Sequence, residues 1–239
     1  MRTLSILFLL VVFMASIASA EQLTTANPIG QGRWVIEGFG IQDQNLGNQS
    51  DGTLTTYGGY VGYGITDQLD AFLNLGASSS SGITAVDPIL GTLDVDVTGS
   101  GYGLSVKYAI LREGEALPVS VAVAGQYKSA SVKTTIKMPA VTGLPDIVSD
   151  ATGSQIAVGV GCSKIIIPFV PYAGVAYRAD SSEGNEVSTQ IDLTVGTAIA
   201  WSEQGAVLVE YTSQAITDKS GGGNDHTSGQ IALAVGYKI

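Results

Sequence analysis

Runs of alternating apolar and small residues fill most of this chain, and the connections between the runs alternate in length. The run at 53–64 ends in a tight turn at 65–68, whereas the next run, which begins at Leu69, leads into a long polar loop at 78–91. Successive side chains of a β-strand point to opposite faces, so this alternation is typical of strands. Short turns on one side of a barrier and long loops on the other are typical of a transmembrane β-barrel.

About ten such runs follow one another from about residue 33 to the last residue. We place the short connections at 65–68, 111–117, 166–170 and 202–205 on the periplasmic side. The longer connections at 43–52, 78–91, 134–150 and 218–227 are placed outside, with one short external connection near 183–185. Bacterial single-chain barrels have an even number of strands. The fold expected is therefore an all-β, antiparallel, up-and-down barrel of ten strands, with eight as the alternative if two weaker runs form loop hairpins.

The apolar face changes within the run at 92–110. Val95 and Val97 occupy odd positions, whereas Leu104 and the apolar residues after it occupy even positions. We expect a glycine-rich bulge at 98–101 to reset the face of this strand.

Composition supports a sheet with one face in lipid. The chain is 45% hydrophobic and 13% charged, and after residue 20 no apolar run is long enough for a membrane helix. The less apolar face of the runs carries mainly Gly, Ala, Ser and Thr, which suit the narrow interior of a small barrel. A soluble secreted β-sandwich is the remote alternative, but it would expose many charged residues on that face.

The first 20 residues are predicted to be a cleaved signal peptide. Arg2 provides a weak positive start, residues 6–13 are apolar, and Ala18 and Ala20 flank a small-residue cleavage site. The predicted organisation is a signal peptide at 1–20, a short N-terminal lead-in at 21–30, and an outer-membrane barrel at 31–239.

Net charge and rare residue types exclude several classes of protein. The net charge is −10 and no basic patch is present, so nucleic acid is not an expected partner. A single Cys and a single His cannot build an intramolecular disulfide or a zinc site of the usual kind. We therefore expect no metal and no cofactor.

Several charged residues fall on the face predicted to line the barrel. If a hairpin is centred near 184–185, Arg178 and Asp192 lie directly opposite one another and form an ion pair that fixes register. Interior charges either neutralise one another or form a polar constriction that selects a solute, and the first interpretation is favoured. The candidates are Glu37, Asp70, Lys107, Lys128, Arg178, Asp192, Glu210 and Lys238.

Aromatic residues lie near the ends of several runs, where an aromatic girdle would meet the lipid headgroups. The alternative is that tyrosine simply favours strands. The candidates are Tyr57, Tyr63, Tyr108, Trp201 and Tyr237.

Two segments resemble a known group of proteins. Residues 62–70, GYGITDQLD, look like its strand–turn–strand phrase, and residues 231–239, IALAVGYKI, are similar to its C-terminal assembly signal. The chain resembles small bacterial outer-membrane β-barrel proteins of the porin-like superfamily, although Ile239 stands where that family usually ends in Phe or Trp. The resemblance implies the outer membrane of a Gram-negative-type bacterium, with outer-membrane lipid, lipopolysaccharide and the outer-membrane assembly machinery as partners.

The expected function is structural, or a narrow passive channel for small solutes, because side chains nearly fill a barrel of about ten strands. The alternative is a surface binding or adhesion protein that acts through the loops at 43–52, 78–91 and 134–150. Asp94, Asp96, Asp225 and His226 superficially resemble the catalytic set of omptin-type proteases. Asp225 and His226 are adjacent, however, and would face apart in an extended chain, so we expect no enzymatic activity.

Overall fold

The computed structural model describes residues 25–44, 52–87, 91–114, 118–139, 143–182, 188–217 and 226–239. The predicted signal peptide at 1–20 lies outside these ranges. The strands within them are β1 (Trp34–Gln44), β2 (Thr53–Gly64), β3 (Leu69–Ser81), β4 (Thr84–Asp87), β5 (Gly91–Leu111), β6 (Ser120–Ile136), β7 (Ile147–Ser163), β8 (Phe169–Ser182), β9 (Ser188–Ala200), β10 (Gly205–Thr217) and β11 (His226–Lys238).

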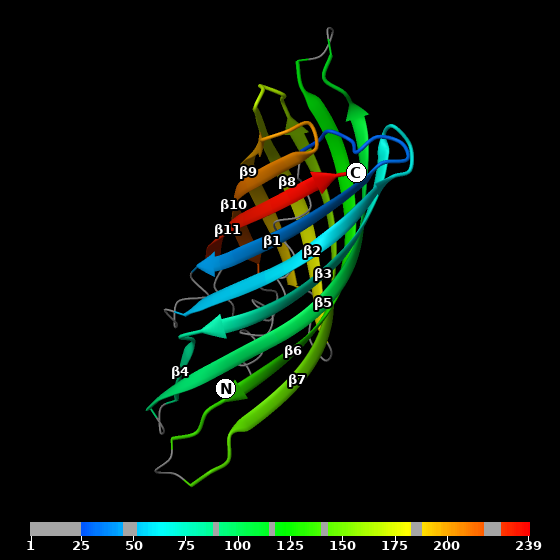
Figure 1. Cartoon of the computed structure of the whole chain (residues 1–239). Helices are drawn as coiled ribbons and strands as arrows, with labels where there is room; N and C mark the ends of the chain where they lie inside the picture. Colours follow the sequence, from blue (N-terminus) through cyan, green and yellow to red (C-terminus); the bar gives the residue numbers. More distant parts are fainter. Residues whose placement is uncertain are drawn as a thin grey trace.

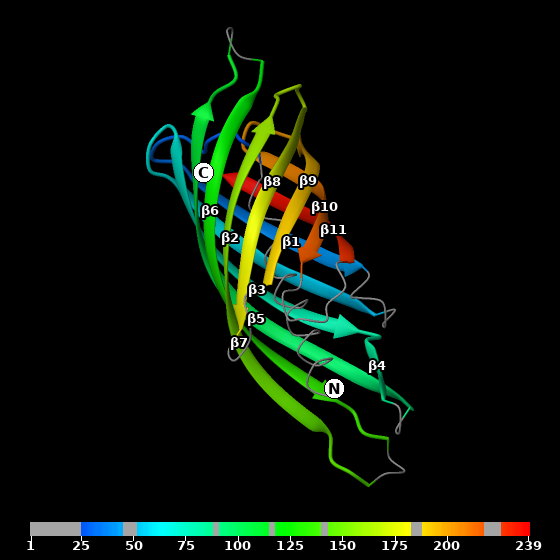
Figure 2. The same cartoon turned by 180° about the vertical axis from the view of Figure 1, so that it is seen from behind.

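The strands form one closed antiparallel sheet (Figures 1 and 2). Each barrel strand pairs with its neighbours in chain order, and β1 pairs with β11 to complete the circle. The short β4 is not part of the circle, because β3 pairs directly with β5. β4 pairs only with the first residues of β5. The predicted ten-stranded, up-and-down barrel is confirmed, in place of the eight-stranded and sandwich alternatives.

Among the residues that the structure describes, none belongs to a helix long and apolar enough to cross a membrane.

Hydroxyl side chains shape two of the tight turns. The Thr66 hydroxyl accepts hydrogen bonds from the backbone N–H groups of Gln68 and Leu69 at 3.1 and 3.0 Å. Ser202 does the same for Gly205 at 2.8 Å. Ser and Thr favour turns because their hydroxyls can replace a backbone partner. These turns, β2–β3 and β9–β10, occur where they were expected, and the connections β5–β6 and β7–β8 lie at the same end of the barrel.

The predicted long loops are shorter than expected where the structure describes them. β3 continues to Ser81, and β4 forms a small hairpin with the start of β5 inside the predicted loop at 78–91. β6 extends to Ile136 and β7 begins at Ile147, so both ends of the predicted loop at 134–150 are strand. The predicted connections near 43–52, 183–185 and 218–227 fall largely outside the described residues.

The predicted bulge at 98–101 is wrong. β3 pairs with β5 without a break from Leu69↔Tyr108 to Ser79↔Thr98, and the register shift of β5 against β6 lies instead between Ala109 and Leu111. Odd-numbered residues of β5 face inward from Leu93 to Ala109, which includes the predicted bulge. The apolar residues change face because the two sides of the strand meet different surroundings along its length. The phase of the strand stays the same.

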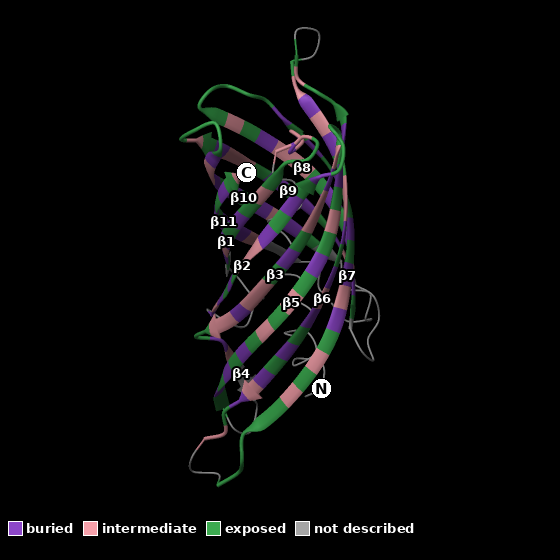
Figure 3. Ribbon diagram, turned by 45° about the vertical axis from the view of Figure 1, so that its right-hand side comes forward, coloured by how far each residue is buried: buried purple, intermediate pink, exposed green. Residues whose placement is uncertain are grey.

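An apolar band surrounds the barrel. Outward-facing Leu73, Leu104, Val158, Leu193 and Leu233 are 47–60% exposed, and buried and exposed residues alternate along the strands (Figure 3). Such a large exposed apolar surface is typical of a face that contacts another apolar phase. In a barrel with polar residues inside, that phase is lipid.

Candidate functional site

The interior of the barrel holds the charged residues that the sequence placed there. Seven of them are between 0% and 7% exposed, and Lys238, near the end of β11, is partly exposed. The seven buried residues are Glu37, Asp70, Lys107, Lys128, Arg178, Asp192 and Glu210.

Arg178 on β8 and Asp192 on β9 form an ion pair inside the barrel. The guanidinium Nε donates to Asp192 Oδ2 at 3.1 Å, a terminal nitrogen contacts the same oxygen, and Gln190 Nε2 donates to Oδ1 at 3.1 Å. The expected register is wrong, because Arg178 pairs with Gln190 and Asp192 with Ala176. The pair is therefore diagonal, a separation that a long arginine side chain can span.

A second network links tyrosine hydroxyls to interior carboxylates. Tyr60 donates to Glu37, and Tyr172 donates to Glu210 Oε2 at 2.9 Å. Thr212 donates to Glu210 Oε1 at 3.4 Å. Buried tyrosines need such partners, but neither tyrosine was among the site residues predicted from the sequence. The available signal was that Tyr60 falls on the same strand face as Gly58 and Gly62, opposite to the face of Tyr57.

Glycine makes room for one of these rings. Gly196 on β9 pairs with both Tyr172 on β8 and Glu210 on β10. A Cβ on Gly196 would lie 2.5 Å from the ring carbon and hydroxyl oxygen of Tyr172. Because such a separation is far below a van der Waals contact, the Tyr172 ring can pass over β9 toward Glu210 only if position 196 has no side chain.

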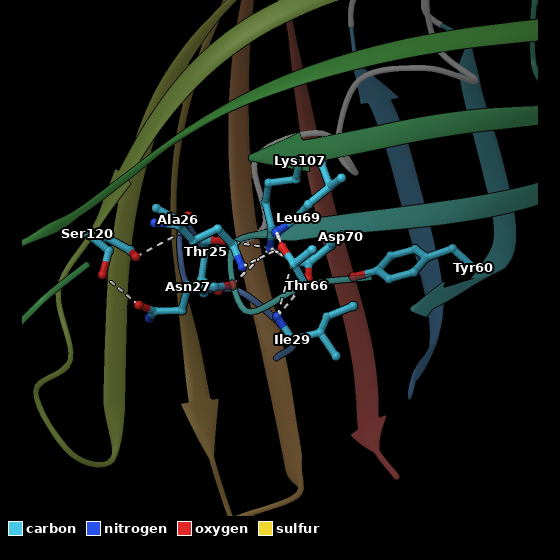
Figure 4. Close-up of polar contacts among 12 residues, drawn as sticks. Thr25, Ala26, Asn27, Ile29, Tyr60, Thr66, Leu69, Asp70, Lys107 and Ser120 are labelled. Carbon is cyan, nitrogen blue, oxygen red and sulfur yellow. Dashed lines mark hydrogen bonds and ion pairs between the residues drawn. The ribbon is translucent and has the colours of Figure 1, made fainter. Parts of the chain in front are cut away.

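The segment before β1 enters the barrel at the end that carries the short turns (Figure 4). Lys107 Nζ donates to the carbonyl oxygens of Asn27 and Thr25 at 2.9 and 3.3 Å. The Asp70 carboxylate accepts the Ile29 N–H at 3.2 and 3.1 Å, and it lies 3.4 Å from Lys107 Nζ. The sequence predicted these two charges as interior residues, but it gave no sign that the lead-in would occupy them.

Some interior amides and carboxylates have atoms without a hydrogen-bond partner in the described part of the chain. Both amide atoms of Asn74 and of Gln230, together with Asp180 Oδ2 and Gln155 Oε1, are in this state. A buried polar atom without a partner costs roughly 1–3 kcal/mol, and proteins usually satisfy such atoms with water. Around these groups the interior therefore has the chemistry of a hydrated polar lumen, whereas Phe39, Ile41 and Leu208 belong to an apolar cluster inside the same barrel.

No protein-family model matches this sequence, and no curated protein matches it. Among solved structures, the transport unit of the autotransporter AIDA-I from Escherichia coli is similar over 96% of this chain and 97% of that chain, with a TM-score of 0.55 and 12% identity. The fold is that of a bacterial outer-membrane β-barrel.

Two further structures match this outer-membrane barrel at lower TM-scores. The N-terminal barrel domain of Pseudomonas aeruginosa OprF is 16% identical, with a TM-score of 0.40 over 88% of this chain and 99% of that chain. The outer-membrane protease OmpT from Escherichia coli is 10% identical, with a TM-score of 0.45 over 87% and 94%.

The candidate girdle residues lie on the outer surface of the outer-membrane barrel, between 36% and 55% exposed. Most of them lie toward the end with the short turns, where the Tyr63 ring is 4.6 Å from that of Trp34. Tyr57 lies toward the opposite end of β2, near the level of Tyr102 on β5. Their role as a girdle stays a prediction. The residues are Tyr57, Tyr63, Tyr108, Trp201 and Tyr237.

The omptin-like set does not gather at one described site on the barrel. Asp94 and Asp96 are exposed on the outer face of β5, away from the lumen. His226 begins β11, where its backbone pairs with Ile216, and Asp225 lies outside the described residues. Within the described ranges, no three His, Cys, Asp or Glu side chains are placed to hold a metal ion.

Proposed function

We propose that this outer-membrane barrel is a narrow passive conduit for small polar solutes. The observation that carries the proposal is that polar and charged side chains line the interior at several levels, on either side of an apolar cluster that includes Phe39 and Leu208. Asp70 and Lys107 lie near the end with the short turns, Glu210 and Thr212 lie further in, and Gln214 lies beyond them along β10. A barrel needed only for support would be more stable with apolar residues packed there.

The width of the interior limits what could pass. Interior side chains such as Arg178 and Gln230 are almost fully buried, and side chains nearly fill barrels of this size. The proposed cargo is therefore restricted to small solutes, and hydrated polar groups along the wall would favour polar ones.

Single-channel recording tests this function. The chain is refolded, its heat-modifiable migration on gels is confirmed, and it is inserted into planar bilayers. Small, reproducible conductance steps are expected. A barrel that is folded by the gel criterion and silent in the bilayer contradicts the proposal.

A second function, surface binding, is favoured by the length of three strands. β5, β6 and β7 contain 21, 17 and 17 residues, whereas the other barrel strands contain 11–14. Their ends away from the short turns reach past the neighbouring strands, together with β4 (Figure 1). Asp94, Asp96 and Lys133 are exposed on the outer face there. If binding is the function, trimming residues 131–150 abolishes adherence of expressing cells to protein- or polysaccharide-coated surfaces, and conductance is absent.

The remaining proposals concern partners and chemistry. Outer-membrane lipid and lipopolysaccharide would surround the apolar band, and the assembly machinery would recognise β11. We propose no catalysis for this barrel. An activity at the external rim that is lost in His226→Ala would contradict that view.

A further inference from the structure

The N-terminal segment at 25–33 lies in the mouth of the barrel that carries the short turns. Ala26 and Ile29 are 4% and 8% exposed there, as buried as residues of a protein core. We propose that this segment is a plug that closes the periplasmic mouth, and that Lys107 and Asp70 are its latch. The inference rests on the proposed passage of solutes, because a plug matters only where something can pass.

The latch recognises the main chain of the plug. Lys107 donates to two plug carbonyls, at 2.9 Å to Asn27 and 3.3 Å to Thr25, and Asp70 accepts the N–H of Ile29. A cation on carbonyls and a carboxylate on an N–H group are charge-assisted hydrogen bonds, which are stronger than neutral ones. The inner wall of the mouth therefore forms a receptor for an extended peptide.

Two serines extend the receptor across the mouth, and Figure 4 shows one of them, Ser120. The Ser120 hydroxyl donates to Asn27 Oδ1 at 2.7 Å, and the Ser163 hydroxyl accepts the Ala26 N–H at 3.0 Å. The contacts come from β3, β5, β6 and β7, which are adjacent around the barrel. The plug thus spans the opening instead of following one strand.

Glycines let the chain turn from the plug into β1. Gly30 and Gly32 have positive φ angles of 93° and 74°, which few other residues adopt without strain. Gly32 N–H donates to Gly64 O at 2.8 Å. A Cβ on Gly64 would lie 2.0 Å from the Gly30 carbonyl oxygen. Any side chain at position 64 that points inward must therefore displace the plug or distort β2.

The arrangement also allows the plug to leave. Lys107 and Asp70 lie 3.4 Å apart, so each retains an opposite charge when the peptide is removed. A mouth lined by a compensated ion pair can be hydrated at a lower cost than one lined by an isolated charge. Release would open a polar entrance to the lumen.

Cysteine accessibility measures closure of the mouth independently of conduction. The probe is Ala122→Cys, an inward-facing residue of β6 that is 3% exposed and lies near the mouth. Cys162, which is exposed on β7, is first replaced by Ser. A membrane-impermeant thiol reagent is then applied from the periplasmic side. Gly64→Ala and a deletion of residues 25–31 should each increase the labelling rate about tenfold or more, a ratio typical of a coupled closure.

Gly40→Ala is the matched control, because a Cβ at that strand glycine meets no atom within 4 Å. It should label at the rate of the unaltered barrel. If Gly64→Ala does not fold by the gel criterion, the near-isosteric pair Lys107→Met with Asp70→Asn removes the latch charges and should also increase labelling.

Conductance separates this inference from the proposed function. Faster labelling together with larger or more frequent openings supports both proposals. Faster labelling in barrels that all remain silent supports the plug and contradicts the conduit. Equal labelling of the intact barrel and the folded plug-deletion variant overturns the plug, whatever the conductance.

Discussion

Arg178 is fully buried, and its guanidinium contacts the carboxylate of Asp192. Removing one partner of a buried ion pair leaves a desolvated charge and typically costs about 3–5 kcal/mol. We therefore expect Arg178→Ala to reduce the free energy of unfolding by roughly that amount, and Arg178→Ala with Asp192→Ala to reduce it less. Urea unfolding in lipid vesicles, followed by tryptophan fluorescence, measures both. A double variant that is no more stable than Arg178→Ala would contradict the explanation.

Lys137 and Asp96 provide an exposed pair for comparison. Their charged atoms are 2.7 Å apart, but the two side chains are 52% and 54% exposed. The hydrogen bond and charge of Asp96 raise the pKa of Lys137 above its ordinary value of 10.5. Any stabilisation is therefore present below pH 10.5 and is lost as the pH rises through the higher folded-state pKa. At neutral pH, Lys137→Ala should leave the unfolding midpoint unchanged, because exposed pairs contribute little. A loss as large as that of Arg178→Ala would refute this.

The sequence identified interior side chains better than it identified their partners. Strand parity placed Glu37 and Lys107 inside, because side chains repeat with a period of two in a strand. The carbonyl partners of Lys107 belong to residues 25–33, which have no strand period from which a position could be inferred. Contacts between such a segment and a distant strand depend on tertiary packing.

β5 shows where the barrel leaves the membrane. Its inner face is Val95 and Val97 at one end and Lys107 at the other, whereas its outer face changes from Asp94 and Asp96 to apolar residues such as Leu104. β6 follows the same course, with Lys133 exposed at one end and Tyr127 nearer the other. The strand keeps its phase while its outer face changes from charged to apolar residues, which indicates a passage from water to lipid. The change of apolar face was therefore predicted correctly, but the bulge was the wrong explanation for it.

This boundary can be located with lysine substitutions on one face of β5. Leu104 lies in the apolar band and is 58% exposed, and Thr98 is exposed on the same face closer to the strand start. Lysine near the middle of a bilayer destabilises a barrel by about 2–4 kcal/mol and much less near its edge. Leu104→Lys should therefore lower the free energy of unfolding in vesicles by roughly that amount, whereas Thr98→Lys should have little effect. Equal losses would place both residues in the same environment.

Closure of the barrel joins the two ends of the strand sequence. Trp34 and Ile239 exchange two backbone hydrogen bonds, N–H to O at 3.0 and 2.8 Å, at the edge where β1 meets β11. The number of alternating runs predicted ten strands. The register between β1 and β11, which form the seam of the barrel, could not be predicted from local sequence patterns. It depends on the stagger of all the strands together.

The seam makes the last residue suitable for testing assembly. Ile239 joins the barrel through its backbone, and its side chain is 65% exposed. Ile239→Phe should therefore leave the folded barrel and its refolding rate in pure lipid vesicles unchanged. If the assembly machinery recognises the end of β11, the same substitution should speed the appearance of the heat-modifiable form in cells, because it restores the ending usual in the proteins that this chain resembles. An equal change in vesicles and cells would assign the effect to intrinsic folding, and no change in either would show that the machinery does not distinguish the two endings.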